Sequence, residues 1–382
     1  MKPRAKGFAF RVLAQSGNAR RSILTTPHGD VDCPTFMPVG TQGSVKTLSP
    51  DEVASTGAQV VLGNTYHLWL RPGADLIAKF GGLHEFSRWP RAMLTDSGGF
   101  QAFSLSKLTK LDENGFVFHS HLDGSKHHLS PEEAVRVQGL IGADIQMQLD
   151  VCPPGNSPRA EVEAAIARTT RWAKRALASP RPEGQALFGI VQGSCFSDLR
   201  RAHADELAAL DPGFDGIALG GFSVGEPIEK MHECLAEVAH YVDAERPRYL
   251  MGVGTMRDLL DAIGAGIDMF DCVLPTRNAR NGQALTRFGR VVIKQARYKD
   301  DPLPIDPECT CAACAGGFSR AYLRHLYIAG EILALRLLSL HNLHAFAELT
   351  RGARAAIEAG TYERFRASAL QALADGKKSE VV

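Results

Sequence analysis

The sequence predicts an α/β protein built as a closed (β/α) barrel, with a zinc-binding subdomain near the C-terminus. Three observations support this. Predicted helices and short apolar strands alternate at least six times along the 382 residues, which indicates a parallel sheet with helical crossovers. Polar residues or glycines stand at the C-terminal end of nearly every predicted strand. Three cysteines are bunched between residues 309 and 314.

Composition and length limit the class of protein and the number of domains. The chain is 45% hydrophobic and 22% charged, as in an ordinary globular protein, and its length fits one large domain plus a smaller piece. The net charge of +1 gives no overall attraction to nucleic acid, so an RNA site must be a local patch.

Cellular location is predicted from what the sequence lacks. Charged residues interrupt positions 1–21, which excludes the apolar core of a signal peptide, and no run approaches the about 18 apolar residues of a membrane span. Five of the eight cysteines are scattered, unlike a disulfide framework. We therefore expect a protein of the reducing cytoplasm with no membrane contact.

The first 130 residues begin with a hairpin and end with an insertion. Residues 8–14 and 21–25 flank a turn at 15–18. A capping serine, Ser49, opens a helix to about residue 57, and strands follow at 60–62 and 92–95. Residues 107–129 interrupt the alternation with two Gly-containing turns and are predicted to form a β-insertion.

The alternation then continues to residue 270. Helices are expected from Ser130 and over 157–177, 199–210, 227–242 and 256–264. Strands are expected at 145–149, 187–191, 216–219, 249–251 and 267–270. Seven or eight such units in a chain of this length favour a barrel, with an open parallel sheet as the alternative.

The strand ends carry the candidate chemistry. They are Asn64, Asp96, Asp150, Gln192, Gly220, Gly221, Gly252 and Asp271. In a barrel these ends meet at one mouth, where active sites lie, although strands also end in polar residues without any function. Asp96 and Asp271 form a carboxylate pair suited to breaking and remaking a bond to a sugar. Arg277 and Arg280, in a predicted loop after Asp271, suggest that the sugar belongs to a nucleic acid.

The cysteine cluster predicts a structural zinc site. Cys309, Cys311 and Cys314 need a fourth ligand to complete a tetrahedron, and three free thiols on a loop would be an oxidative liability. The candidates downstream are His325, His341 and His344. Residues 319–340 read as one amphipathic helix, and a ligand at its C-terminal end can fold back onto the cysteines. This favours His341.

Taken together, these motifs resemble bacterial tRNA-guanine transglycosylase, also called queuine tRNA-ribosyltransferase, over essentially the whole chain. The matching segments are residues 96–101 (DSGGFQ), 192–194 (QGS), 220–226, 251–254 (MGVG) and 270–283 (FDCVLPTRNARNGQ), followed by the cysteine cluster. The resemblance implies an irregular (β/α)8 TIM-type barrel. We expect the barrel, with hairpin and insertion, in residues 1–300, the zinc subdomain in 301–350, and a helical segment packing back on the barrel in 351–382.

The resemblance also implies a reaction: guanine at the anticodon wobble position of tRNA is exchanged for a 7-deazaguanine base. Asp271 is then the nucleophile that forms a covalent ribosyl-enzyme, and Asp96 is the general acid/base. The implied base-binding residues are Ser97, Gly98, Gly99, Phe100, Asp150, Cys152, Gln192, Gly221 and Met251. The implied RNA-binding residues are Gly252, Val253, Gly254, Thr255, Met256, Arg257, Asp258, Thr276, Arg277, Asn278, Ala279 and Arg280.

Two positions bear on specificity within this resemblance. Val224 stands where queuine-using eukaryotic members tend to have Gly, which predicts 7-aminomethyl-7-deazaguanine (the prequeuosine base) as substrate, in a step of queuosine biosynthesis. Val151 departs from the Glu usual in bacterial members. The expected partners are tRNAs with a G-U-N anticodon, which accept aspartate, asparagine, histidine or tyrosine, and a second copy of the chain in a homodimer.

Two other functions fit parts of the pattern. A glycoside hydrolase for free sugars also uses two carboxylates, but 7% aromatic residues and the arginines after Asp271 argue against a sugar-stacking cleft. A zinc-containing RNA-binding accessory subunit without activity should lack one carboxylate, whereas this chain keeps both Asp96 and Asp271.

Overall fold

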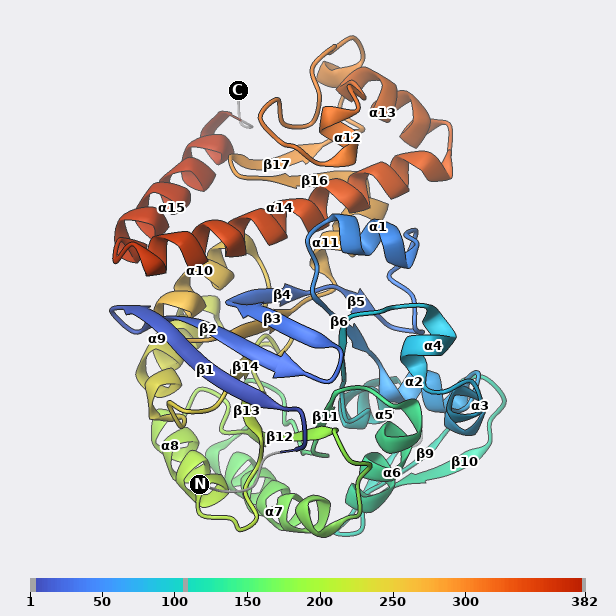
Figure 1. The fold of residues 1–382 in the computed structure, drawn as a ribbon, viewed down its shortest axis with the longest axis vertical. Coiled ribbons are helices and arrows are strands. Elements are labelled where there is room, and N and C mark those ends of the chain that lie inside the picture. Colours follow the sequence, from blue (N-terminus) through green and yellow to red (C-terminus); the bar gives the residue numbers. More distant parts are fainter. Residues whose placement is uncertain (1–4, 106–108, 380–382) are drawn as a thin grey trace.

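A parallel β-barrel forms the centre of the computed structural model, which describes residues 5–105 and 109–379 (Figure 1). Its sheet has the strand order β4-β15-β14-β13-β12-β11-β7-β6-β5. The edge strands β4 (Thr35–Met37) and β5 (Val39–Gly40) are separated only by Pro38, so they are two halves of one broken strand and the sheet closes on itself. Proline interrupts a strand because it lacks a backbone N–H. The barrel prediction is therefore confirmed over the open sheet.

The other seven barrel strands pair in parallel throughout the described chain. They are β6 (Val60–Gly63), β7 (Ala92–Thr95), β11 (Ile145–Met147), β12 (Ala186–Val191), β13 (Gly216–Leu219), β14 (Arg248–Leu250) and β15 (Met269–Asp271). Their alternate side chains fill the barrel interior with apolar groups. Packing there is tight enough to need a glycine: a Cβ on Gly216 would lie 2.4 Å from the ring of Phe188.

Helices surround the barrel at the positions that the sequence predicts, and also over residues 65–87 and 99–105, where no helix was predicted. They are α1 (Pro50–Ser55), α2 (Thr65–Leu70), α3 (Ala74–Lys79), α4 (Leu83–Ser87), α5 (Gly99–Leu105), α6 (Pro131–Ile141), α7 (Arg159–Ala178), α8 (Ser197–Ala208), α9 (Ile228–Val238) and α10 (Met256–Gly264). Ser49 and Glu52 form the predicted capping box of α1, and Ser130 caps α6. Ser157 does not cap its helix, because Pro158 takes the cap position of α7 without a side-chain hydrogen bond.

The predicted N-terminal hairpin is part of a three-stranded antiparallel sheet, formed by β1 (Ala9–Ser16), β2 (Ala19–Thr26) and β3 (Gly29–Cys33). This sheet lies across the barrel in Figure 1, over the N-terminal ends of the barrel strands. We call this end of the barrel the floor. Arg20 forms a buried ion pair there with Asp268, which also accepts a hydrogen bond of 3.0 Å from Ser22 Oγ.

The predicted β-insertion is present after α5. It consists of β8 (Lys110–Leu111), β9 (Phe116–His119) and β10 (Lys126–Leu129), paired antiparallel. Positions 107 and 108, with which the prediction begins, lie outside the described residues, as do 1–4 and 380–382. Phe116 packs edge-on against Trp172 of α7 and anchors the insertion to the barrel.

The C-terminal part differs most from prediction. It contains α11 (Leu274–Arg280), the unpredicted hairpin β16 (Gln283–Thr286) and β17 (Gly289–Val292), α12 (Ala312–Ala315), α13 (Arg320–Ile328), α14 (Ile332–Glu358) and α15 (Tyr362–Ser379). The prediction of one helix over 319–340 is wrong, because the chain breaks at Gly330, whose φ of +76° suits glycine. α14 continues past residue 350, where one domain boundary was expected.

α14 lies between the barrel and the C-terminal hairpin, and α15 runs back toward that hairpin (Figure 1), in contact with α10, α14 and β17. Tyr362 of α15 donates a hydrogen bond of 2.6 Å to the carbonyl of Leu260 in α10. Arg366 pairs with Asp261 of the same helix. In the part of the chain that the structure describes, every helix is too short or too polar to cross a membrane.

Candidate active site and metal centre

The barrel mouth holds a cavity of about 370 Å³. Every polar strand end that the sequence singled out lines it: Asn64, Asp96, Asp150, Gln192, Gly220, Gly221, Gly252 and Asp271. Of the predicted base-binding set, Ser97, Gly98, Phe100, Cys152 and Met251 also lie on its wall. Gly99 instead lines a neighbouring cavity that shares Phe100, Asp150 and Cys152 with the first. Because parallel strands end at the same face of the barrel, residues as far apart in the sequence as Asn64 and Asp271 line one cavity.

Asp271 ends β15 with one carboxylate oxygen fixed. Tyr249 Oη donates to Oδ1 at 2.6 Å, and the backbone N–H of Gly252 donates to the same atom at 2.7 Å. Among the described residues no hydrogen bond reaches Oδ2. Burial raises the pKa of Asp271 above its ordinary value, while the two donors oppose that rise. The side chain therefore presents one oriented and one free oxygen to the cavity.

Asp96 follows β7 and is held by neutral donors at the start of α2. Asn64 Nδ2 donates to Oδ2 at 2.6 Å and the Thr65 backbone N–H to Oδ1 at 2.8 Å. Burial raises the pKa of Asp96 to about 7, and the nearby charge of Asp271 adds to the rise. A carboxyl group with this pKa can both give and take a proton near neutral pH.

Asp150 and Gln192, which follow the neighbouring strands β11 and β12, form a hydrogen-bonded pair on the cavity wall. Gln192 Nε2 donates to Asp150 Oδ2 at 2.6 Å, and burial raises the pKa of Asp150 to about 6. Gln192 Oε1 is buried with no partner among the described residues. A Cβ on Gly221 would lie 2.3 Å from that oxygen, so the glycine makes room for it. The pair offers unfilled acceptor capacity to a ligand rich in N–H groups.

Two residues that support the site were not identified from the sequence. Arg200 of α8 is 0% exposed, and it donates to the carbonyls of Ser194 at 2.6 Å and Gly220 at 2.9 Å, which joins two loops of the mouth. Its position in an amphipathic helix gave no signal of burial. Tyr249, the donor to Asp271, was visible only as a strand residue, because the facing carboxylate comes from the next strand.

The segment around Val224 is tied to Glu226. The Glu226 carboxylate accepts hydrogen bonds from the backbone N–H groups of Ser223 and Val224. Val151, the departure from the family pattern, is buried in an apolar cluster with Phe116 and Trp172. Its side chain therefore contributes packing at the place where a carboxylate was expected.

The predicted RNA-binding residues divide by exposure. Arginines 277 and 280 lie on helix α11, so the prediction of a loop there is wrong, and Pro275 sits in its first turn, where proline is tolerated. Exposed or half-buried members are Gly252, Thr255, Arg257, Arg277, Asn278 and Arg280. Buried members are Val253, Gly254, Met256, Asp258, Thr276 and Ala279. Only the first group presents side chains or backbone to a ligand outside the barrel.

The three clustered cysteines and His341 converge in the C-terminal part. His341 Nδ1 lies 3.6 Å from Sγ of Cys309, 3.6 Å from Sγ of Cys311 and 3.4 Å from Sγ of Cys314. Three thiols and one imidazole at such distances can hold a metal ion. His341 is the predicted ligand, but it lies in the middle of α14 rather than at a helix end. His325 is exposed, and His344 contacts Thr310 at 3.1 Å.

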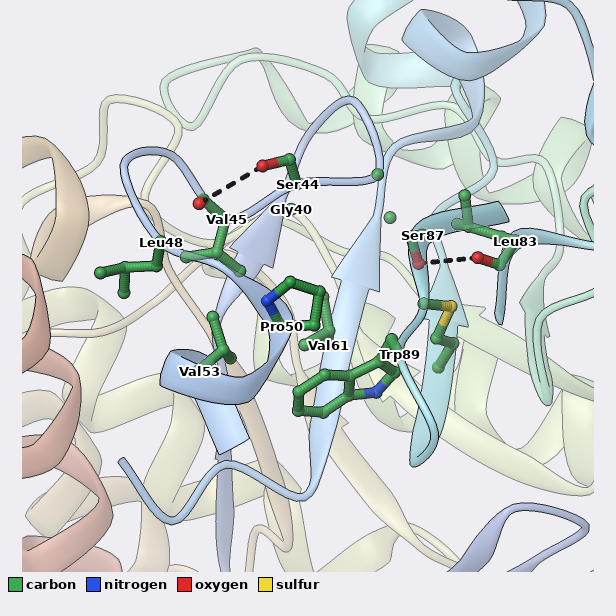
Figure 2. Close-up of a pocket in the computed structure, with 13 residues that line it drawn as sticks. Gly40, Ser44, Val45, Leu48, Pro50, Val53, Val61, Leu83, Ser87 and Trp89 are labelled. Carbon is green, nitrogen blue, oxygen red and sulfur yellow. Dashed lines mark hydrogen bonds between the residues drawn. The ribbon is translucent and has the colours of Figure 1, made fainter. Parts of the chain in front are cut away.

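A further cavity lies outside the barrel wall, beside α1 and Trp89 (Figure 2). Its lining is mainly aliphatic, with Val45, Val53 and Val61 among the labelled side chains. The hydroxyl of Ser87 is already bonded to the carbonyl of Leu83 at 2.7 Å. None of the site residues predicted from the sequence lines this cavity.

Fold and site together define a (β/α)8-barrel enzyme of the glycosyltransferase class, with an added Cys3His subdomain. The chain belongs to the queuine tRNA-ribosyltransferase family, whose family model matches residues 15–375. A queuine tRNA-ribosyltransferase of Sorangium cellulosum is 68% identical over 362 residues, covering 95% of this chain and 91% of the relative. One from Solidesulfovibrio magneticus is 54% identical, covering 94% of this chain and 96% of the relative.

Proposed function

We propose that this protein exchanges guanine at the anticodon wobble position of tRNA for 7-aminomethyl-7-deazaguanine, a step of queuosine biosynthesis. The observation that carries the proposal is the pair of buried carboxylates, Asp96 and Asp271, that face one cavity and have no ion-pair partner among the described residues. Membership of the queuine tRNA-ribosyltransferase family supports tRNA and a 7-deazaguanine base as the reactants.

Asp271 is the proposed nucleophile. Its Oδ2 attacks the anomeric carbon of the ribose, the glycosidic bond to guanine breaks, and the bonding electrons leave with the base. Tyr249 and Gly252 hold Oδ1 and so aim Oδ2. The product is a covalent ribosyl-enzyme that leaves the RNA strand intact. The incoming base then attacks the same carbon and releases Asp271.

Asp96 is the proposed general acid/base. It gives a proton to the leaving guanine and takes one from the incoming base, so its protonation is restored after each exchange. Its pKa of about 7 suits both steps, because neither proton transfer is strongly uphill near neutral pH.

The base-binding assignment rests on donor and acceptor matching. A guanine-like ring carries neighbouring N–H donors on one edge, and Asp150 together with the unpaired Gln192 Oε1 supplies acceptors for them. Phe100 is 50% exposed at the mouth, where its ring can stack on a base taken out of the anticodon. The Val224 side chain narrows the cavity near Glu226 and so favours the small aminomethyl group over the larger side group of queuine.

The remaining assignments concern RNA, metal and assembly. The exposed Arg257 and Arg277 and the half-buried Arg280 are the proposed contacts to phosphates and bases next to the wobble position, in tRNAs with a G-U-N anticodon. The Cys3His cluster fits a zinc ion with all four positions filled by protein, hence a structural one. We also infer a homodimer; light scattering at micromolar concentration that gives the mass of one chain would contradict it.

The test is incorporation of labelled guanine into unmodified tRNA with a G-U-N anticodon. We expect Asp271→Asn to lower the rate by roughly 10³-fold or more, because no covalent intermediate can form. The exposed Asp300→Asn is the matched control and should exchange like the wild type. Equal label with Asp271→Asn would show that the nucleophile is assigned wrongly. No label with the folded, metal-loaded wild type would favour the accessory-subunit alternative.

A further inference from the structure

The floor of the barrel carries a cluster that the exchange reaction does not use. His28 lies in the turn between β2 and β3, His84 lies in α4, and Asp144 directly precedes β11. His28 Nδ1 is 2.7 Å from Asp144 Oδ1, and His84 Nε2 is 3.1 Å from Asp144 Oδ2. The two imidazole rings stack with their centroids 3.6 Å apart. Three distant segments thus present two imidazoles and a carboxylate to one another.

Asp144 has the properties of a fixed anionic ligand. Its side chain is 1% exposed, and the backbone N–H of Met93 donates to Oδ2 at 2.8 Å. Burial acts to raise the pKa of Asp144, but hydrogen bonds from His84 and His28 outweigh it and hold that pKa below its ordinary value. A backbone donor of this kind orients the carboxylate in the way that outer contacts orient metal ligands.

The two histidines differ in their freedom to move. His84 is 7% exposed and is held within α4, whereas the His28 side chain is 39% exposed on a turn. His28 can therefore rotate without disturbing the core, and its exposed side leaves room for water. The donor atoms of all three residues already lie within 4.8 Å of one another.

We propose that His28, His84 and Asp144 form a second metal site, which takes a borderline divalent ion such as Zn²⁺, Co²⁺ or Ni²⁺ and clamps the N-terminal sheet to the barrel floor. Two imidazole nitrogens and one carboxylate are a ligand set that such ions accept, with water in the remaining position. Rotation of His28 would bring its ring nitrogen to about 2.0–2.1 Å from an ion that is also bound by His84 and Asp144. The ion takes the place of the protons on the imidazole nitrogens that face Asp144, and each neutral ring then carries its proton on its other nitrogen.

This site lies at the opposite end of the strands from the candidate active site. Residues at the N-terminal face of a barrel contribute to stability, whereas those at the C-terminal face take part in catalysis. We therefore expect the second ion to stabilise the fold without changing the rate of base exchange. Its three protein ligands and exposed edge also predict weaker binding than at the closed Cys3His cluster.

The experiment is equilibrium dialysis of the untagged full chain, with its cysteine site filled, against micromolar Co²⁺. Cobalt bound to thiolates absorbs through sulfur-to-metal charge transfer, so the two sites are distinguished by their spectra. We expect a second equivalent without thiolate absorption and a melting temperature higher by at least about 2 °C. His28→Ala should lose both effects. His240→Ala, another exposed histidine, is the matched control and should keep them.

Each outcome decides the proposal. A total of one metal ion per wild-type chain, held at the cysteine site, would overturn it. A second equivalent that survives His28→Ala would also overturn it, because the ion would then bind elsewhere. Since His28 lies on an exposed turn, its substitution leaves the folded protein available for measurement. Base exchange assayed in parallel separates the two questions: failure of exchange would concern Asp96 and Asp271, whereas cobalt uptake reports only on the floor.

Discussion

Buried carboxylates stand at both ends of the barrel, but they are treated differently. At the floor, Asp268 is paired with Arg20, and Asp144 faces two histidines. At the mouth, Asp96 and Asp271 contact only neutral donors, such as Asn64 and Tyr249. At both ends folding removes a carboxylate from water, but only at the floor does the protein provide a partner of opposite charge.

The difference shows what each end is for. A paired carboxylate is satisfied inside the fold, so at the floor it joins the N-terminal sheet to the barrel. Burial raises the pKa of the paired Asp268 as well as those of Asp96 and Asp271, but only the unpaired carboxylates keep interactions that a substrate can use. The mouth is therefore less stable but more reactive, and four predictions on three substitutions test this contrast.

Among these substitutions, the largest effect should come from Asp96→Asn at the mouth. We expect the rate of guanine exchange to fall by roughly 10²–10⁴-fold, because no group remains to move the proton of the base. Single-turnover assays with labelled guanine measure it, with circular dichroism as the check on folding. An unchanged rate would remove Asp96 from the reaction.

At the floor, Asp268→Asn should instead affect stability. It leaves Arg20 buried without its carboxylate, which costs about 3–5 kcal/mol of the free energy of unfolding. Urea unfolding measures the loss, and the exchange rate per folded molecule should stay at the wild-type value. A fall in that rate with normal stability would break the contrast between the two ends.

The raised pKa of Asp96 predicts a dependence of stability on pH. Between its ordinary value of 3.8 and its folded value of about 7, the folded protein binds a proton that the unfolded chain has lost. The carboxyl group therefore destabilises the fold increasingly as pH rises through this range, and the effect is complete above about pH 7. Asp96→Asn has no carboxyl group to titrate. The free energy of unfolding of the variant, relative to that of the wild type, should therefore rise by on the order of 1–4 kcal/mol between about pH 4 and about pH 7.

Unfolding curves of both proteins across that range provide the measurement. A difference that stays constant with pH would show that Asp96 is ionised with an ordinary pKa. A difference that shrinks as pH rises would have the wrong sign for a buried unpaired acid.

The smallest expected effect is that of Tyr249→Phe, which removes one of the two hydrogen bonds to Asp271 Oδ1. Gly252 keeps the other, so we expect a loss of about tenfold in the exchange rate, as for one hydrogen bond to a charged group. Because Tyr249 acts through Asp271, the loss should appear in kcat rather than in KM for tRNA. An effect on KM alone would indicate a different role.

The barrel could be predicted because each helix and each short apolar strand is recognisable from a local stretch of sequence, and the two alternate regularly. The mouth could be predicted for the same reason, since strand ends converge by topology. Arg200 could not, because its burial depends on loops brought together by folding. His341 was predicted from the number of ligands needed, whereas its place within α14 depends on a helix break at Gly330 that the periodicity did not show.

Helix α14 links the predicted metal centre to the candidate active site through the hydrogen bonds of one asparagine. Next to His341, the predicted fourth ligand, Asn342 donates to the carbonyl of Pro275 at 2.8 Å and accepts from the N–H of Leu285 at 2.7 Å. Pro275 lies four residues after Asp271. An ion at the Cys3His cluster would fix this helix and, through Asn342, the segment that follows the proposed nucleophile Asp271, so loss of the cysteines should lower the rate of base exchange.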